Sequence, residues 1–325
     1  MSNIKVVHIS QTPLVGAPSK IATATRLLGH YADAICMVDY PASGGLAGKF
    51  VNDSIVMNGA PPEIERLVER LLAEAEIVHL HNEVTAEKAE WLLDRAAKAR
   101  FVYQVHSPVR EGPLYIPRAH EFGLPFSAHL VVGQYQPRHY PSYTPVPNIV
   151  LDTPTCAPRT RVQKLRVMFS PTHARSGRWN GKYSRKLEVA IESLEKMGLI
   201  EKVWPEHPVS PNILMTLRRT CHVSIDEIVT GAFHQVSIEG LCAGNVVINR
   251  ADYFSKAMMA NCAEAPELPP FVYADDECIA DVLVDLARDW EKTAMLQKQG
   301  SEYFRNYLKP KLLVKSFIRA YREII

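Results

Sequence analysis

The sequence has none of the features that would assign it to a specialised class of protein. No apolar run approaches the ~18 residues of a membrane span, and no Cys-x-x-Cys pair, internal repeat or low-complexity segment occurs. The formal net charge is only +2, which excludes a surface that binds polyanions in general. The N-terminus lacks the apolar stretch and cleavage site of a secretory signal. These absences predict a protein that is neither exported nor transmembrane.

The composition is that of an ordinary globular protein. Hydrophobic residues make up 47% of the chain and charged residues 22%. Most of the six cysteines lie in apolar surroundings such as Ala-Ile-Cys-Met-Val around Cys36, which indicates free buried thiols in a reducing, cytoplasmic location. Because 325 residues exceed what one core usually supports, two domains of roughly 150 residues are expected.

Short apolar runs alternate with longer segments of helical periodicity along the first half of the chain. This alternation is typical of βα units and a parallel sheet. Strands are expected at residues 4–9, 34–38, 77–80, 101–105 and 130–132, and helices at residues 19–28, 62–75 and 85–99. The first half is therefore predicted to be a doubly wound α/β domain.

A proline-rich segment divides the chain near its middle. Six prolines fall between residues 137 and 158, which excludes a helix and predicts an extended crossing between two lobes. The alternation then resumes, with strands expected at 165–169, 222–225 and 246–249, helices at 185–197 and 236–243, and a helical pattern from 279 onward that breaks at Pro310. We expect domains at 1–152 and 153–307, a C-terminal helix at 308–325, and a ligand site in the cleft at the carboxyl ends of the strands.

The clearest charge feature is a segment without acidic residues. Nine basic residues and no acidic one lie between Asp152 and Glu188. Three of them, Arg175, Arg178 and Lys182, fall between a predicted strand and a predicted helix, where cationic groups and helix N–H groups can surround a phosphate. Most charge runs are simply solvated faces, but the position of this loop favours the phosphate site.

One carboxylate, Glu239, lies in an otherwise apolar segment that leads into a predicted strand. A helix beginning near Gln235 would place Glu239 in about its first turn, facing the same cleft as the basic loop. The carboxylate could accept hydrogen bonds from the vicinal hydroxyls of a ribose, while backbone N–H groups of Gln235, Val236 and Ser237 hold a phosphate. The alternative is a charge that only stabilises the helix N-terminus.

The segment 224–248 resembles the donor site of GT-B glycosyltransferases, in particular the retaining family 4 type. The family's usual form is Glu-Gly-Phe-Gly, four residues, then Glu-Ala-x-Ala-x-Gly-x-Pro-Val-Ile, and the match holds at Phe233, Glu239, Ala243, Gly244, Val247 and Ile248. Further matches follow in order along nearly the whole chain: the glycine loop 7–16, Ile77-Val-His-Leu-His81, the strand 101–107, Val146-Pro-Asn148 with Asp152, and the basic loop 169–182.

The resemblance implies two Rossmann-like doubly wound domains that face a cleft, and transfer of a sugar from a nucleoside diphosphate sugar, such as a UDP-sugar, with retention. By this resemblance Glu239 holds the ribose, and Arg178 with Lys182 binds the diphosphate, with Arg175 as a competing candidate. His106 lies near the transferred sugar, and Gly16 lets the first loop approach it. The first domain forms the acceptor side and the second binds the donor.

Two positions depart from the family pattern. Gly231 stands where the family has the glutamate that contacts the sugar's hydroxyls, and Asp226 with Glu227 could contribute instead. His234 replaces a glycine and puts a side chain where the backbone normally approaches the donor. The identity of the sugar stays open, and impaired catalysis is one interpretation.

The sequence indicates no metal. There is no Asp-x-Asp, and Asp275-Asp-Glu277 lies at an expected helix start, where a cap explains it better. His79 and His81 share one face of a strand but have no neighbouring cysteine and no obvious third ligand. We therefore expect cationic and backbone donors to stabilise the leaving diphosphate without a metal, and no cofactor besides the nucleotide-sugar co-substrate.

The expected function is sugar transfer to an acceptor glycan, a lipid-linked sugar or a small molecule, and two rivals stay open. The nine basic residues could guide a nucleic-acid backbone, so that the acceptor is a modified DNA base. Alternatively, Gly231 and His234 mark a non-catalytic sugar-nucleotide-binding or scaffold protein. The sequence indicates no oligomeric state.

Overall fold

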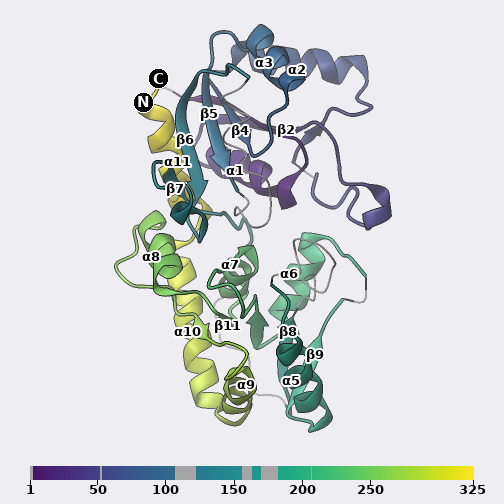
Figure 1. The fold of residues 1–325 in the computed structure, drawn as a ribbon, viewed down its shortest axis with the longest axis vertical. Helices are drawn as coiled ribbons and strands as arrows, with labels where there is room; N and C mark the ends of the chain where they lie inside the picture. Colours follow the sequence, from purple (N-terminus) through teal and green to yellow (C-terminus); the bar gives the residue numbers. More distant parts are fainter. Residues whose placement is uncertain (1–2, 52, 107–121, 156–162, 170–181, 206) are drawn as a thin grey trace. The chain divides into compact units, whose positions relative to one another are not determined.

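The computed structural model describes residues 3–51, 53–106, 122–155, 163–169, 182–205 and 207–325. The chain divides into two compact units, one of residues 1–151 and 310–325 and the other of residues 152–309 (Figure 1). Each unit is a parallel sheet with helices on both faces. The predicted fold class, α/β with two doubly wound domains, is confirmed.

The first unit is built on a seven-stranded sheet in the order β3-β2-β1-β4-β5-β6-β7. Neighbouring strands all pair in parallel. The strands are β1 Lys5–Ser10, β2 Tyr31–Cys36, β3 Ile55–Val56, β4 Ile77–His81, β5 Arg100–Val105, β6 Phe126–Val132 and β7 Thr144–Val146; the helices are α1 Ala17–Arg26, α2 Pro62–Glu74, α3 Ala86–Arg95 and α11 Pro310–Arg322.

The two faces of this sheet carry different side chains. Val7, Val78 and Leu80 point to the face covered by α2 and α3 and join the apolar core there. His8, His79 and His81 alternate with those residues along β1 and β4, so they point to the opposite face. Phe317 and Tyr321 of α11 lie on that face, in ring contact with His79.

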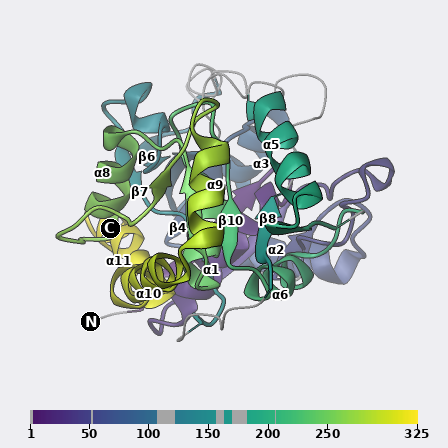
Figure 2. The ribbon, with the colours of Figure 1, turned by 90° about the horizontal axis from the view of Figure 1, so that it is seen from below.

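The second unit is built on a five-stranded parallel sheet in the order β12-β11-β10-β8-β9, of which the neighbouring strands β10 and β8 are labelled in Figure 2. Its strands are β8 Leu165–Phe169, β9 Ile200–Val203, β10 Val223–Ile225, β11 Val246–Asn249 and β12 Val272–Tyr273. Its helices are α5 Arg185–Lys196, α6 Pro211–Arg219, α7 Gln235–Cys242, α8 Tyr253–Cys262, α9 Ile279–Arg288 and α10 Trp290–Tyr307. Helices α5 and α9 share one apolar core with the strands, and Leu214 and Leu217 of α6 pack with Met168 on the other face.

Both sheets contain a point where the strand order reverses. In the first unit it lies between β1 and β4, and in the second between β8 and β10. In open α/β sheets the chain segments at the carboxyl ends of such a strand pair diverge to opposite faces, and ligands bind in the crevice between them. The loops after β8 and β10 are therefore the first place to look for a site in the second unit.

The proline-rich segment is more ordered than the sequence suggests. Thr144–Val146 forms the edge strand β7, and Gln136–Arg138 forms a short 3₁₀ helix. Pro145 fits because an edge strand leaves one row of backbone groups unpaired. In the part of the chain described, no helix is both long and apolar enough to cross a bilayer.

Candidate functional site

Two acidic residues directly follow β10 at the strand reversal of the second unit. Asp226 and Glu227 are 3% and 1% exposed. The Glu227 carboxylate accepts hydrogen bonds from the Val229 and Thr230 backbone N–H groups at 2.7 and 2.8 Å, and from the Thr230 hydroxyl. Glu227 thus shapes the loop that leads to α7, and the suggestion that it contacts a sugar stays a prediction.

Asp226 holds the start of α7. Its carboxylate accepts from the His234 backbone N–H at 2.5 Å and from the Ser237 hydroxyl at 2.7 Å, and His234 Nδ1 lies 3.2 Å from its second oxygen. Burial alone would raise the pKa of Asp226. The His234 imidazole and the hydrogen bonds from His234 and Ser237 outweigh that effect, and they hold the pKa well below its ordinary value.

The lowered pKa makes Asp226 a source of stability that disappears in acid. An ionised Asp226 stabilises the fold above the unfolded-state pKa of ~3.9, and this contribution is lost as the pH falls toward the folded-state pKa. We expect Asp226→Asn to lower the free energy of unfolding by about 2–4 kcal/mol at pH 7, because charged hydrogen bonds are lost. Urea unfolding from pH 7 to pH 2.5 should show the difference from wild type shrinking below pH ~4; a constant difference would contradict the assignment.

The backbone conformation at position 231 favours glycine. Its φ of +81° lies in the left-handed region, and an added Cβ would meet Asp252 Oδ2 at 3.5 Å, an ordinary contact. Backbone conformation rather than space therefore selects glycine. A glutamate at this φ would strain the loop.

A substitution series at Gly231 separates strain from crowding. Gly231→Ala should cost about 1–2 kcal/mol in the free energy of unfolding, whereas Gly231→Asn should cost less, because asparagine tolerates the left-handed region. Urea unfolding of both variants checks this order. Equal stability of the alanine variant and wild type would mean that the loop relaxes to another conformation.

Helix α7 begins where the sequence predicts but places Glu239 deeper. His234 is the N-cap and Gln235 the first helical residue, so Glu239 is the fifth residue and lies in the second turn. The Ser237 N–H donates to the His234 carbonyl at 3.0 Å, and the Ser237 hydroxyl accepts from Asn249 Nδ2 at 2.9 Å. Of the three expected phosphate donors, Ser237 therefore has a partner within the chain, and Gln235 and Val236 are half-buried at the helix start.

Glu239 is held by an arginine that the sequence analysis missed. Arg218 Nη2 at the end of α6 donates to Glu239 Oε2 at 3.1 Å; the side chains are 4% and 19% exposed. No described residue bonds the other oxygen, Oε1. The carboxylate therefore has one oxygen anchored on the protein and one directed to a partly exposed position.

Arg218 belongs to a polar network buried beneath α7. Its Nη1 donates to the Ser224 hydroxyl at 3.1 Å, and that hydroxyl donates to Asn245 Oδ1 at 2.8 Å. Asn245 Nδ2 donates in turn to the carbonyl groups of Arg218 and Cys221 at 3.1 and 2.5 Å. The network fixes the guanidinium, and the guanidinium fixes Glu239.

The basic loop is only partly described. Arg175 and Arg178 lie outside the described residues. Lys182 is 6% exposed and lies just before α5, which Ser184 caps by accepting the Leu187 N–H at 3.0 Å. The segment that contains Lys182 follows β8, and the segment that contains Glu239 follows β10. These two strands are neighbours at the strand reversal of the sheet.

The loop after β1 in the first unit has an unusual backbone. Leu14, Val15 and Gly16 have φ values of 47°, 56° and 77°. Such values in two consecutive non-glycine residues are costly, and strained segments of this kind cluster at functional sites. Gly16 is the N-cap of α1, and its carbonyl accepts from the Ser19 hydroxyl at 3.0 Å.

His106 is the outer member of a chain of hydrogen-bonded imidazoles. Its Nε2 lies 2.7 Å from His81 Nδ1, and His81 Nε2 lies 3.0 Å from His8 Nδ1. Burial lowers the pKa of His8 and His106 to about 3 and holds those of His79 and His81 well below the ordinary value. All four imidazoles are therefore neutral at neutral pH, and His106 alone among them is half-buried.

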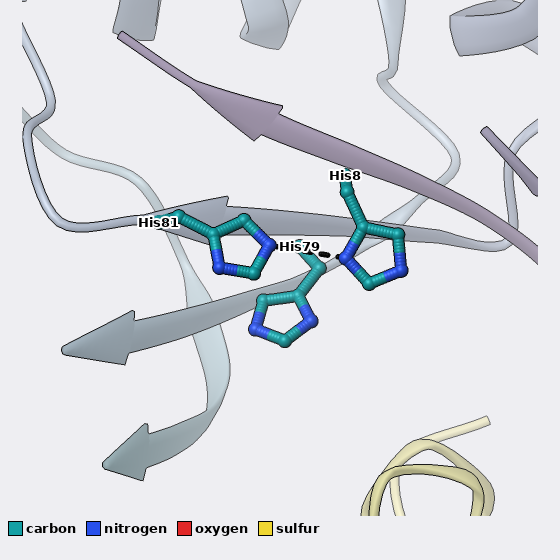
Figure 3. A group of neighbouring side chains, drawn as sticks. All are labelled: His8, His79 and His81. Carbon is teal, nitrogen blue, oxygen red and sulfur yellow. Dashed lines mark hydrogen bonds between the residues drawn. The ribbon is translucent and has the colours of Figure 1, made fainter. Parts of the chain in front are cut away.

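The sequence analysis found no third partner for His79 and His81, and the structure supplies one in His8. The parallel register of β1 against β4 sets His8 opposite His79. Figure 3 shows the three rings gathered on one side of these strands. The alternation of polar residues within the apolar strand Lys5–Ser10 was the only available signal for His8.

The acidic cluster near residue 275 orders the turn before α9 rather than capping the helix as expected, because the N-cap of α9 is Cys278, with no side-chain cap hydrogen bond. Asp275 Oδ1 accepts from the Glu277 and Cys278 N–H groups at 3.0 and 3.1 Å, just before α9. Cys36, Cys221, Cys242, Cys262 and Cys278 are free thiols.

Comparison with known proteins identifies the fold. No family model matches the sequence, and no characterised protein matches it by sequence. An alpha-glucosyltransferase, solved in complex with UDP and a 13-mer DNA containing a central A:G mismatch, is 9% identical with a TM-score of 0.63 over 98% of this chain and 99% of that chain. The chain has the GT-B fold.

Other GT-B proteins match over the same length. A sucrose-phosphate synthase from Thermosynechococcus elongatus is 12% identical, with a TM-score of 0.60 over 98% of each chain. A glycosyltransferase from Rickettsia africae is 12% identical, with a TM-score of 0.57 over 99% of each chain. At these identities the likeness establishes the GT-B fold, and function must be argued from the residues of the site.

Proposed function

We propose that the protein is a glycosyltransferase that moves a sugar from a UDP-sugar to an acceptor, with retention. The observation that carries the proposal is Glu239 on α7 of a GT-B second unit, with Oε2 anchored by Arg218 and Oε1 without a described partner. An anchored carboxylate with one oxygen to offer suits a ribose hydroxyl. The UDP in the structure of the alpha-glucosyltransferase supports the choice of nucleotide.

In this proposal the second unit binds the donor diphosphate. The N-terminus of α7 supplies N–H groups and the positive end of a helix dipole. Lys182, together with Arg178 or Arg175, neutralises the charge that develops as the sugar leaves. Such preorganised cations stabilise a leaving diphosphate without a metal, so the transfer needs none.

The first unit would supply the acceptor side. Two hydrogen bonds hold the backbone of His106. Its backbone N–H donates to Asn82 Oδ1 at 2.7 Å, and its backbone carbonyl accepts from Gln136 Nε2 at 2.9 Å. Its Nδ1 has no hydrogen-bond partner among the described residues. A fixed, neutral imidazole with one ring nitrogen to spare suits a hydroxyl of the transferred sugar, and Gly16 lies at the strained loop in the same unit.

The proposal is tested with a panel of nucleotide sugars. Purified protein is incubated with UDP-, GDP-, ADP- and CDP-sugars, with and without acceptors, and the released nucleoside diphosphate is measured in chelator. We expect release from a UDP-sugar that continues in chelator. Binding of a UDP-sugar without release on any acceptor would contradict transfer and favour the scaffold interpretation.

A nucleic-acid acceptor is the second candidate function. Two observations favour it: the nine basic residues between Asp152 and Glu188, and the DNA bound to the alpha-glucosyltransferase that matches in fold. Contacts to phosphates make affinity fall steeply with salt. A steep loss of duplex binding between 50 and 200 mM salt, together with sugar transfer to DNA, would select this acceptor.

A further inference from the structure

The first unit contains a cluster of three histidines to which the proposed transfer gives no role. His8 comes from β1 and His79 and His81 from β4, and their exposed fractions are 0%, 0% and 1%. One donor atom from each residue lies within 4.8 Å of the other two (Figure 3). We propose that this cluster binds a divalent transition-metal ion of the Zn²⁺ type.

The outer partners of the rings orient the cluster. His79 Nδ1 lies 2.7 Å from the Tyr321 hydroxyl, and His81 Nδ1 lies 2.7 Å from His106 Nε2. Both residues therefore offer Nε2 to the cluster. Metal-binding histidines usually have the second ring nitrogen held in this way, which fixes tautomer and orientation.

The spacing of the donor atoms is close to that of a metal site. His8 Nδ1 and His81 Nε2 are 3.0 Å apart. Zinc–nitrogen bonds of about 2.0–2.1 Å with tetrahedral angles place two ligand atoms about 3.3–3.4 Å apart. If His8 Nδ1 and His81 Nε2 moved apart by a few tenths of an ångström and the His79 ring rotated toward them, all three residues could coordinate one ion. The metal would then replace the hydrogen bond between His8 and His81.

An unmet polar group points to the same site. His79 Nε2 is buried and has no hydrogen-bond partner among the described residues. Buried polar groups are rarely left in this state, because a lost hydrogen bond is costly. Metal coordination would satisfy this nitrogen.

The ligand chemistry selects the class of ion. Three neutral imidazoles suit Zn²⁺, Co²⁺ or Cu²⁺, whereas Mg²⁺ and Ca²⁺ require oxygen ligands. Gln104, in register with His81 on β5, lies on the same face and offers an amide oxygen for the fourth position. The cluster lies at the strand reversal between β1 and β4, in a different unit from the donor residues, so the site is compatible with a transfer that needs no metal.

The test uses the full chain after removal of metals by a chelator and gel filtration. Co²⁺ and then Zn²⁺ are titrated, and the Co²⁺ absorption spectrum, the stoichiometry and the melting temperature are recorded. We expect one equivalent of Co²⁺ with visible absorption bands, displacement by Zn²⁺, and a higher melting temperature. His8→Gln and His79→Gln should each weaken binding more than 10-fold, and Tyr321→Phe about 10-fold, as for loss of an outer partner.

His129→Gln is the matched control. His129 pairs in register with Tyr103, which pairs with Leu80, so it lies in the same sheet but on the face opposite the cluster. This variant should bind Co²⁺ like wild type. Absence of Co²⁺ absorption, or binding that persists in His79→Gln, would overturn the proposal. If the ligand variants do not fold, unchanged affinity in Tyr321→Phe would overturn it equally.

Discussion

Glu239→Ala should lower kcat/KM for sugar transfer by about 100-fold or more. Hydrogen bonds to a charged group contribute about 1.5–3 kcal/mol each, and one or two bonds from the ribose hydroxyls to Oε1 would account for this loss. The loss should appear in the Kd for UDP as well, because the ribose belongs to the nucleotide. Steady-state kinetics and calorimetric titration with UDP measure both.

Glu201→Ala is the control for this experiment. Glu201 is also a glutamate in an ion pair with an arginine of the second unit, with Arg166 Nη2 at 3.3 Å from its Oε1. Arg166 and Glu201 are the second residues of β8 and β9, so the same charge is removed near the start of these strands, away from the loops that follow β8 and β10. A Glu239 variant whose kcat/KM lies within a few-fold of the Glu201 variant would exclude Glu239 from donor binding.

Arg218→Met should destabilise the second unit by about 2–4 kcal/mol, because it leaves Glu239 without its partner and removes a hydrogen bond to Ser224. The partial exposure of Glu239 keeps the effect at the lower end of the range for buried pairs. The double variant Arg218→Met/Glu239→Gln should recover much of the loss, since no charge then remains unpaired. Urea unfolding of the four proteins gives the coupling energy.

The kinetics of Arg218→Met test whether Arg218 acts only by orienting Glu239. If Arg218 acts only by orienting Glu239, Arg218→Met raises KM for the UDP-sugar and changes kcat little, and the effect disappears in the Glu239→Gln background. Coupled effects on stability together with an unchanged KM would show that the ion pair is a structural contact with no bearing on the donor.

The strands and helices with strong hydrophobic periodicity could be predicted from sequence. Leu165–Phe169 and Val246–Asn249 were predicted to the residue, because they are short apolar runs with clear flanks. The two-residue strands Ile55–Val56 and Val272–Tyr273 carry too few residues to show a period. Thr144–Val146 was not predicted as a strand, because the prolines around it indicated an extended crossing between the two lobes.

The candidate site was predicted in part, and the gaps have a common physical cause. Glu239 stood out as a charge in an apolar segment, but Arg218 and His8 did not, because their partners are defined only by packing. Arg218 is 21 residues from Glu239 in sequence, and His8 is 73 residues from His81. Contacts at such separations depend on strand order and helix placement, which residue patterns within one segment do not contain.

A crystal structure with UDP tests the central claim most directly. The account predicts the ribose hydroxyls within hydrogen-bond distance of Glu239 Oε1, Oε2 still on Arg218, and the diphosphate at the N-terminus of α7 near Lys182. UDP bound elsewhere, or bound here with the ribose turned away from Glu239, would contradict the account.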